Sequence, residues 1–371
     1  MSFRICLIDA VPGAADAPIG LAASARRTAL LQAVRRHGGV LRALDYRSAC
    51  EAAALPGAEV YKFDAPGQNE ALDHWFLGIG AQQRGEAAPP PRAPGEIHAR
   101  ACWFAGFAAA LHRIAVKAPA ARWLNSAESI LGMTDKWSCQ QHLAAHGLRI
   151  PPLLGRVDSF AHLESLMAAH GCTQVFVKPR FGSSGSGVIA LRRSAQRWQA
   201  ISSVRLIAGR LFNQLRVRAL CDRHAIASLV DHLLAATPCY VEGWIPKPRV
   251  PGTADSSFDL RVIAWHGQLR QCIARVAATP ISNLHLGNLR IAPHWLSGPQ
   301  RAAIAQTVSQ VAAAFPGAQV CGLDLIVRAR DVVVLEVNAF GDHLREVHAA
   351  DGASAADDQA AHWRALFRRS A

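Results

Sequence analysis

The sequence predicts an α/β protein that becomes α+β beyond about residue 125, and three features of the chain support that prediction. Near the N-terminus, an apolar run, a helical pattern and a second apolar run follow one another. In the middle, a Gly/Ser-rich stretch lies between two β-branched runs, and near the C-terminus a hairpin pattern carries carboxylates among apolar residues. We expect an N-terminal α/β domain over 1–125, a central subdomain over 126–240 and a C-terminal subdomain over 241–371.

The composition is that of a globular protein, because about half of the 371 residues are apolar. The N-terminus lacks the regions of a signal peptide, no apolar stretch approaches the roughly 20 residues of a membrane span, and the nine scattered cysteines suit a reducing compartment. We therefore expect a cytoplasmic protein without membrane association. The net charge of +13 leaves nucleic acid open as a partner, but the arginines are dispersed and no nucleic-acid-binding motif supports it.

The first third of the chain has the order strand, helix, strand. Residues 4–9 form an apolar run, a helical pattern covers about 20–37, and a second apolar run follows at 40–46. This order predicts parallel strands joined by a crossover helix. A proline-rich loop at 86–96 interrupts the pattern, and a further helix is expected over 98–117.

A domain boundary is expected at about 125–134, where a new helix begins. Thr134 is a natural N-cap with Asp135 in the first turn, and the helix is expected to run to Gly147. Residues 192–236 are expected to form a mostly helical insertion with arginines on its polar faces.

The stretch VFVKPRFGSSGSGVIA (175–190) joins two strand-like runs through a loop of glycines and serines. It is not a P-loop, because Val188 follows Gly187 where a Lys-Ser/Thr pair belongs, and Ala190 breaks the dinucleotide-binding pattern. We expect a flexible hairpin that binds phosphate with backbone N–H groups and serines, helped by Lys178 upstream. The alternative is a surface hairpin without a ligand. Only five lysines occur in the chain, and retaining one inside a strand favours phosphate binding.

A hairpin near the C-terminus, GLDLIVRARDVVVLEVNAF, is the second candidate site. With a three-residue turn at 329–331, Asp324 lies opposite Glu336, and Asn338 lies on the same face. Opposed carboxylates in apolar surroundings repel each other, and a cation removes that cost. Oxygen ligands of this kind suit Mg²⁺ or Mn²⁺ bridging to nucleotide phosphates. The alternative is a hairpin end exposed to water, which the apolar flanks disfavour. A final amphipathic helix is expected over 357–369.

A third element, SSFDLRVIAWHGQLRQCIARVAA, places Asp259 and Arg261 on one face of a strand. A turn at 266–268 brings Arg275 across from Asp259. After Arg275 comes a loop with several hydrogen-bond donors: Asn283, His285, Asn288 and Arg290.

In this order, the three elements resemble the ATP-grasp superfamily over roughly 123–345. The sequence is most similar to the branch of ribosomal-protein glutamate ligases, glutathione synthetases and peptide-modifying ligases. The resemblance implies an ATP-grasp fold, in which two β-sheet subdomains hold a nucleotide between them behind an N-terminal α/β domain. Two features depart from the branch. The segment between the glycine-rich loop and the stretch YVEGWIP (240–246), which matches the hinge of the family, is longer. Ala-Phe-Gly-Asp-His follows Asn338 instead of a Ser-Pro-Gly-like turn.

The resemblance also implies roles for residues of this sequence. The implied ATP site is made by Lys136, Lys178, Gly182, Ser183, Ser184, Gly185, Ser186, Gly187, Glu242, Trp244 and Ile245. Within it, Glu242 is expected to contact the ribose. The implied ligands of Mg²⁺ or Mn²⁺ are Asp324, Glu336 and Asn338. The implied catalytic residues are Arg275, Arg261 and Asn283, while His285 and His343 are candidates for proton transfer without an assigned general base.

The implied reaction is an ADP-forming ligation of a carboxylate to an amine through an acyl phosphate. The expected substrate is a peptide or a small amino-acid-like molecule, and a homo-oligomer is left open. Two alternatives remain: an ATP-grasp kinase that phosphorylates a hydroxyl, and an ATP-binding regulatory protein without ligase activity.

Overall fold

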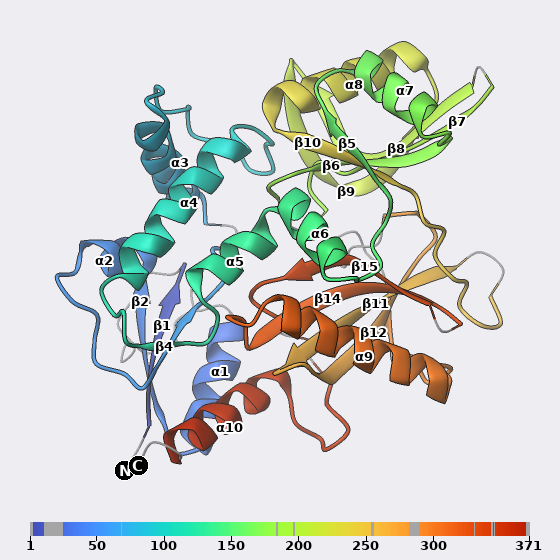
Figure 1. The fold of residues 1–371 in the computed structure, drawn as a ribbon. Helices are drawn as coiled ribbons and strands as arrows, with labels where there is room; N and C mark the ends of the chain where they lie inside the picture. Colours follow the sequence, from blue (N-terminus) through green and yellow to red (C-terminus); the bar gives the residue numbers. More distant parts are fainter. Residues whose placement is uncertain are drawn as a thin grey trace.

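The computed structural model describes residues 3–10, 25–67, 69–182, 185–195, 197–253, 256–281, 289–329, 331–342, 344 and 346–368. Within these ranges the chain forms a four-stranded, a six-stranded and a five-stranded sheet, with helices packed around them (Figure 1). None of the helices in these ranges is both long and apolar enough to cross a membrane.

The first sheet has the strand order β2-β1-β3-β4, and its strands are parallel. The predicted strand–helix–strand start is confirmed. The elements of this part are β1 (Arg4–Asp9), α1 (Ala25–Arg36), β2 (Val40–Asp45), α2 (Tyr46–Glu51), β3 (Val60–Phe63), α3 (Glu70–Arg84), α4 (Arg100–Ala115) and β4 (Arg122–Trp123). Helices α3 and α4 touch backbone to backbone at Gly80 and Gly106, where a Cβ would lie 1.8 Å from a carbonyl oxygen of the other helix.

Two helices connect the first sheet to the rest, α5 (Ala127–Thr134) and α6 (Lys136–Ala145). The expected N-cap was wrong by one residue. Asp135 caps α6, because its carboxylate accepts from Ser138 N at 3.3 Å, while Thr134 ends α5 and its hydroxyl donates to Ile130 O at 2.7 Å. The positive end of the helix dipole also stabilises a carboxylate at the N-cap.

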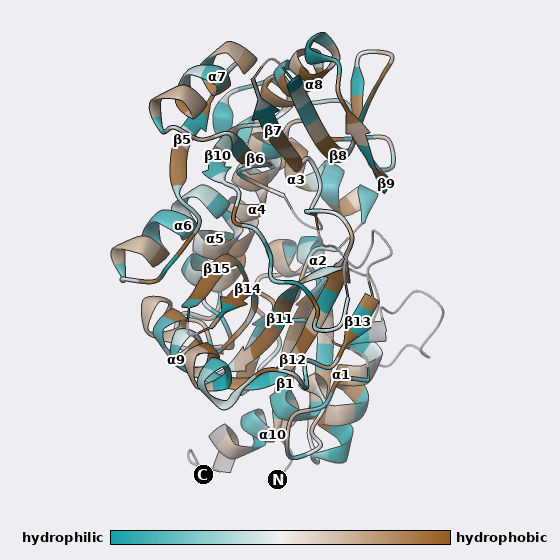
Figure 2. Ribbon diagram, turned by 90° about the vertical axis from the view of Figure 1, so that its right-hand side faces the viewer, coloured by the Kyte–Doolittle hydropathy of each residue, from teal (hydrophilic) through white to brown (hydrophobic). Residues whose placement is uncertain are grey.

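The second sheet is antiparallel with the order β5-β10-β6-β7-β8-β9. Its strands are β5 (Leu153–Val157), β6 (Gln174–Pro179), β7 (Ile189–Ser194), β8 (Arg197–Ile207), β9 (Arg210–Leu220) and β10 (Cys239–Gly243). Helices α7 (Phe160–Ala169) and α8 (Arg223–Ala236) pack on it, and their apolar side chains share one core with the sheet (Figure 2).

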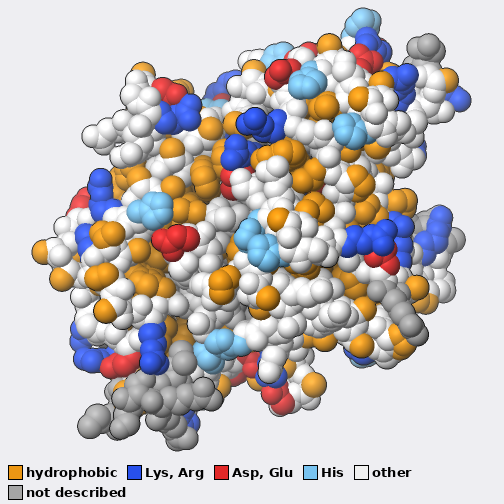
Figure 3. All heavy atoms as spheres, viewed as in Figure 1, with side chains coloured by type: hydrophobic (Ala, Val, Ile, Leu, Met, Phe, Trp, Pro, Cys, Tyr) orange, Lys and Arg blue, Asp and Glu red, His pale blue; other side chains and the backbone are white. Residues whose placement is uncertain are grey.

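The expected helical insertion over 192–236 was wrong for most of its length, because β8 and β9 form a long hairpin and only α8 is helical. Ala208 and Gly209 both have positive φ, +48° and +75°, as the two-residue turn of a hairpin requires. The alternation of apolar and arginine residues over 215–218 is the strand signal that we overlooked. Basic side chains on the face in Figure 3 are scattered among acidic and neutral ones, which agrees with a dispersed charge.

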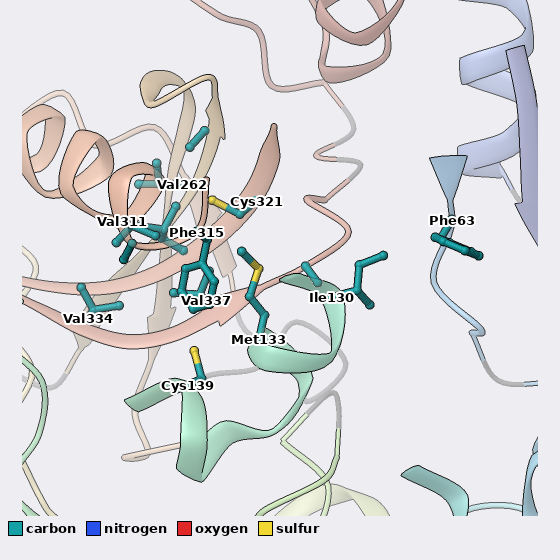
Figure 4. Packing of buried hydrophobic residues seen from close by; sticks show 14 of the residues in the cluster. Phe63, Ile130, Met133, Cys139, Val262, Val311, Phe315, Cys321, Val334 and Val337 are labelled. Carbon is teal, nitrogen blue, oxygen red and sulfur yellow. The ribbon is translucent and has the colours of Figure 1, made fainter. Parts of the chain in front are cut away.

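The third sheet is antiparallel with the order β13-β12-β11-β14-β15. Its strands are β11 (Ser257–Trp265), β12 (Gln268–Ala277), β13 (Leu289–Ile291), β14 (Val320–Arg328) and β15 (Asp331–Asn338). Helix α9 (Gly298–Ala314) packs on this sheet, and the expected final helix is confirmed as α10 (Ala355–Arg368), which lies beside α1 (Figure 1). Figure 4 shows Met133 of α5 and Cys139 of α6 meeting Cys321 and Val337 of the sheet, so α5 and α6 are fixed to it by a common core.

Candidate active site

The glycine-rich loop joins β6 to β7, which are antiparallel neighbours, as the sequence predicted. Gly185 and Gly187 have φ values of +67° and +79°, which side chains with a Cβ rarely adopt. A Cβ on Gly187 would also lie 2.4 Å from Cγ of Pro179, so any other residue here would force the loop or the proline ring to shift. Ser183 and Ser184 lie outside the described residues.

The loop is attached at its start to the first part of the chain. Arg180 donates two hydrogen bonds to Asp135, at 2.7 and 2.6 Å, and the Phe181 ring stacks on Phe104 of α4 with 4.2 Å between ring centroids. Burial opposes ionisation of Asp135, but Arg180 outweighs it and lowers the pKa of this carboxyl. These contacts hold Pro179–Phe181 while the glycines beyond keep their conformational freedom.

Both lysines expected to bind phosphate are paired with carboxylates. Lys178 of β6 pairs with Glu242 of β10, and Lys136 at the start of α6 pairs with Glu336 of β15. Glu242 is only 1% exposed, and its Oε2 has no hydrogen-bond partner. The structure therefore places Glu242 against a lysine, and contact with a ribose stays a prediction.

Two neighbouring spaces follow strands β6 and β10. The inner one is a cavity of about 40 Å³, little more than the space of one water; it is lined by Lys136, Lys178, Gly182, Gly185, Ser186, Tyr240 and Glu336, among others. The outer one is a cleft of about 480 Å³ lined by Gln174, Trp244, Ile245, Arg149 and Arg328, among others. The ring centroids of Trp244 and Phe176 lie 5.2 Å apart, and Phe176 stands on β6 between Gln174 and Lys178. The outer cleft offers room for a planar ligand, whereas the lysine–carboxylate pairs must open before phosphates can enter the inner cavity.

The hairpin of β14 and β15, called the carboxylate hairpin because it carries Asp324 and Glu336, has the predicted strand partners but a different turn. Asp324 pairs with Glu336 as expected, yet Arg328 pairs with Asp331, so the turn has two residues and the expected three-residue turn was wrong. A β-bulge at Leu335 adds the missing residue and restores the pairing. With its amide oriented to match its neighbours, Asn338 donates to Glu336 Oε1 at 3.2 Å and accepts from Arg261.

A chain of alternating charges crosses the third sheet beside this hairpin. The predicted pair of Asp259 and Arg275 is confirmed, with Arg275 Nε 2.7 Å from Asp259 Oδ1. The expected turn at 266–268 was wrong, because Trp265 pairs with Gln268 and a bulge at Arg270 restores the pairing. Arg275 Nη2 lies 3.0 Å from Asp324 Oδ2, and Arg261 Nη1 lies 2.8 Å from Asp324 Oδ1. Arg261 Nε also lies 3.3 Å from Asp342. The two arginines are thereby fixed between three carboxylates.

Burial and charge act differently on the three carboxyl groups, of which Asp259 and Asp324 are buried and Glu336 is half-buried. Burial opposes ionisation of Asp259, but Lys247 and then Arg275 outweigh it and place its pKa well below the ordinary range. Burial likewise opposes ionisation of Glu336, and Lys136 outweighs it, so that pKa is lowered. At Asp324, burial outweighs the nearby arginines and raises the pKa.

The residues fit a hard divalent cation. The set offers two carboxylates and an amide oxygen from Asp324, Glu336 and Asn338, which are the ligand types that Mg²⁺ prefers. Asp324 Oδ1 is buried without a geometrically sound hydrogen bond, although Arg261 lies 2.8 Å away, so this oxygen is open to a further ligand. Among the described residues no cluster of three or more His, Cys, Asp or Glu side chains could hold a metal, so the site depends on the amide and on outside ligands.

The structure brings most of the expected site residues into one region, while Asn283, His285, Asn288 and His343 lie outside the described residues. The sequence analysis missed Lys247, whose Nζ lies 2.8 Å from Asp259, and Arg180, which holds the glycine-rich loop. The scarcity of lysine was the signal that could have found Lys247, because it is one of only five. No sequence signal distinguished Arg180 from the other arginines.

Comparison with known proteins identifies the fold. No protein-family model and no curated protein matches the sequence. Among solved structures, D-cycloserine synthetase DcsG superposes with a TM-score of 0.57 at 16% identity, covering 99% of each chain. ATP-grasp ligase PsnB complexed with a minimal precursor gives 0.56 at 13% identity, covering 98% of this chain and 99% of that one. D-alanine–D-alanine ligase from Bacillus anthracis complexed with ATP gives 0.51 at 10%, covering 99% and 95%.

The chain therefore has the ATP-grasp fold, as the sequence predicted. At identities of 10–16% the likeness shows the fold alone, and the branch within the superfamily stays a prediction.

Proposed function

We propose that this protein is an ATP-dependent, ADP-forming ligase that joins a carboxylate to an amine. The observation that carries the proposal is a set of contacts: the glycine-rich hairpin, Lys136, Lys178 and Glu336 line one cavity. Asp324, which is the strand partner of Glu336, is paired with both Arg261 and Arg275. Phosphoryl transfer from ATP needs positioning and charge neutralisation, which these groups supply.

The nucleotide would lie along β6 and β10. Trp244 and Ile245 line the 480 Å³ cleft, which suits an adenine ring, and Lys178 with Lys136 would exchange their carboxylate partners for phosphate oxygens. Gly185 and Gly187 would let backbone N–H groups approach the same phosphates.

Asp324, Glu336 and Asn338 would hold Mg²⁺, which supplies neutralisation of charge on the β- and γ-phosphate oxygens when it is bound. Lys136, which is paired with Glu336 in the free protein, would part from that carboxylate when Glu336 serves as a metal ligand. The lysine would then be available to the phosphates.

Arg275 and Arg261 would stabilise negative charge on the transferring phosphoryl group and on the acyl phosphate. The transfer would form a bond from a substrate carboxylate oxygen to the γ-phosphorus and break the bond to ADP. Attack of the amine on the acyl carbon would then expel phosphate. The glycine-rich hairpin would cover the cavity and exclude water that would hydrolyse the acyl phosphate.

The substrate class is proposed from the neighbours in structure. PsnB is an ATP-grasp ligase seen with precursor peptides, and another neighbour is a D-alanine–D-alanine ligase. A peptide or amino-acid-like carboxylate and an amine are the substrates that these likenesses support.

The test is an assay with Mg²⁺, ATP, pooled small carboxylates or a cell extract, and hydroxylamine as a trap. ADP together with a hydroxamate supports the proposal, and the mass of the hydroxamate names the acid. ADP with a phosphorylated product and no hydroxamate replaces the ligase by a kinase. Arg275→Gln is expected to abolish the signal, whereas Arg270→Gln is the matched control, because Arg270 lies on the same strand but pairs with Asp351 and Asp358.

A further inference from the structure

Lys247 is a buried lysine that the proposed reaction leaves without a role. It follows the hinge strand β10 and stands between Pro246 and Pro248. Its Nζ lies 2.8 Å from Asp259 Oδ2, and the two side chains are 9% and 1% exposed. Burial lowers the pKa of Lys247, although Asp259 opposes that effect. Burial deprives an ammonium group of its hydration, so a lysine in this position depends on its ionic partners.

The backbone around Lys247 is fixed on both sides. Arg328 donates to the carbonyl oxygen of Pro246, and Phe258 N donates to that of Pro248 at 3.0 Å. The two prolines fix their own φ angles, and Pro248 also restricts the backbone of Lys247. The ammonium group is therefore held in place from its own segment, and it reaches Asp259 as a fixed charge.

Asp259 is shared between Lys247 and Arg275. One carboxylate oxygen faces Lys247 Nζ and the other accepts from Arg275 Nε. The network beside the proposed metal ligands contains three carboxylates and three cations: Asp259, Asp324, Asp342, Arg261, Arg275 and Lys247. Lys247 thus lies on the opposite side of the Asp259 carboxylate from Arg275, and its removal would take one positive charge from this network.

We propose that Lys247 is a positioning residue for Arg275, acting through Asp259. By neutralising Asp259, it keeps that carboxylate as an orienting partner of Arg275 Nε and leaves the arginine's positive charge to the reacting phosphoryl group. Lys247 itself does not contact the substrate. This inference rests on the proposed function, because that function gives Arg275 its task.

The test compares Lys247→Met and Lys247→Arg with Lys62→Met. Lys62 is the matched control: it is a buried lysine 2.7 Å from Asp64, with side chains 2% and 4% exposed, in the first sheet. A misplaced catalytic group costs about 100-fold in rate, so kcat for ADP formation is expected to fall by about that factor in Lys247→Met. The KM for ATP is expected to stay within about threefold, since no nucleotide contact is removed. Lys247→Arg is expected to restore most of kcat, and Lys62→Met to lose stability with kcat unchanged.

A second readout does not depend on turnover. The Nε–H resonance of Arg275, assigned by its absence in Arg275→Lys, reports the hydrogen bond to Asp259 in ¹H–¹⁵N spectra. It is expected to shift in Lys247→Met and to keep its position in Lys62→Met. If the ligase assay fails while this shift occurs, the positioning of Arg275 stands and the proposed function does not. An unshifted resonance, a normal kcat in Lys247→Met, or an equal loss of kcat in Lys62→Met would each overturn the inference.

Discussion

Lys178 and Glu242 form an ion pair whose two halves are expected to respond oppositely to substitution. The lysine side chain is 16% exposed and the glutamate side chain 2% exposed, so the lysine reaches the cavity while the carboxylate lies behind it. A hydrogen bond to a charged group contributes about 1.5–3 kcal/mol. Lys178→Met is therefore expected to weaken ATP binding by about 10- to 150-fold, since each 1.4 kcal/mol is about a factor of ten.

Glu242→Gln removes the carboxylate that competes with phosphate for Lys178. The lysine then carries an unbalanced charge in the free protein, and ATP affinity is expected to rise. The free energy of unfolding is expected to fall, because removing one partner of a buried ion pair costs about 3–5 kcal/mol. If Glu242 contacts the ribose instead, the same substitution weakens ATP binding, so the sign of the change separates the two roles.

The assay is calorimetric titration with Mg²⁺ and a non-hydrolysable ATP analogue. Lys117→Met is the matched control, because Lys117 donates to three backbone carbonyl oxygens at the end of α2 and lines neither of the two spaces described above. That variant is expected to lose stability and keep its affinity. Unchanged affinity in Lys178→Met would refute the phosphate role and return the glycine-rich loop to a surface hairpin without a ligand.

Three further predictions follow from the same site. Glu336→Gln is expected to raise the Mg²⁺ concentration needed for half-maximal ADP formation by about tenfold, because Mg²⁺ affinity depends on ligand charge; an unchanged Mg²⁺ titration excludes this ligand. Gly187→Ala is expected to raise the KM for ATP, because its Cβ would clash with Pro179. Gly171→Ala is the control, since it shares the roughly 1–2 kcal/mol cost of positive φ but its Cβ meets nothing within 4 Å. Equal changes of the KM in the two variants would exclude the clash with Pro179 as the cause. The lowered pKa of Asp135 means that its pair with Arg180 stabilises the loop above about pH 4 and is lost as the pH falls through that lowered pKa. The protection factors of the loop amides, which correct hydrogen exchange for its intrinsic pH dependence, are expected to fall on acidification in the wild type and to be low at every pH in Asp135→Asn.

Local pattern explains the parts of the site that the sequence predicted. The partners Asp324 and Glu336, and likewise Asp259 and Arg275, follow from the period of two along a strand and a short turn. Even so, the turn length was wrong in the carboxylate hairpin, and a bulge at Leu335 compensated for it. A bulge leaves no reliable mark in a single sequence, because it depends on how the strand packs.

The sequence by itself determined the fold class, the glycine-rich loop between β6 and β7, and the hairpins β11–β12 and β14–β15, because these depend on φ preferences and on residues close together in the chain. Only the tertiary structure decided which lysine meets which carboxylate: Lys136 and Glu336 are 200 residues apart, and no local pattern links them. It also decided that the arginine-rich segment forms strands, since a half-exposed hairpin and an exposed helix face can carry the same residues. A charged group that packing buries needs a partner of opposite charge, and which groups become buried together depends on the fold of the whole chain.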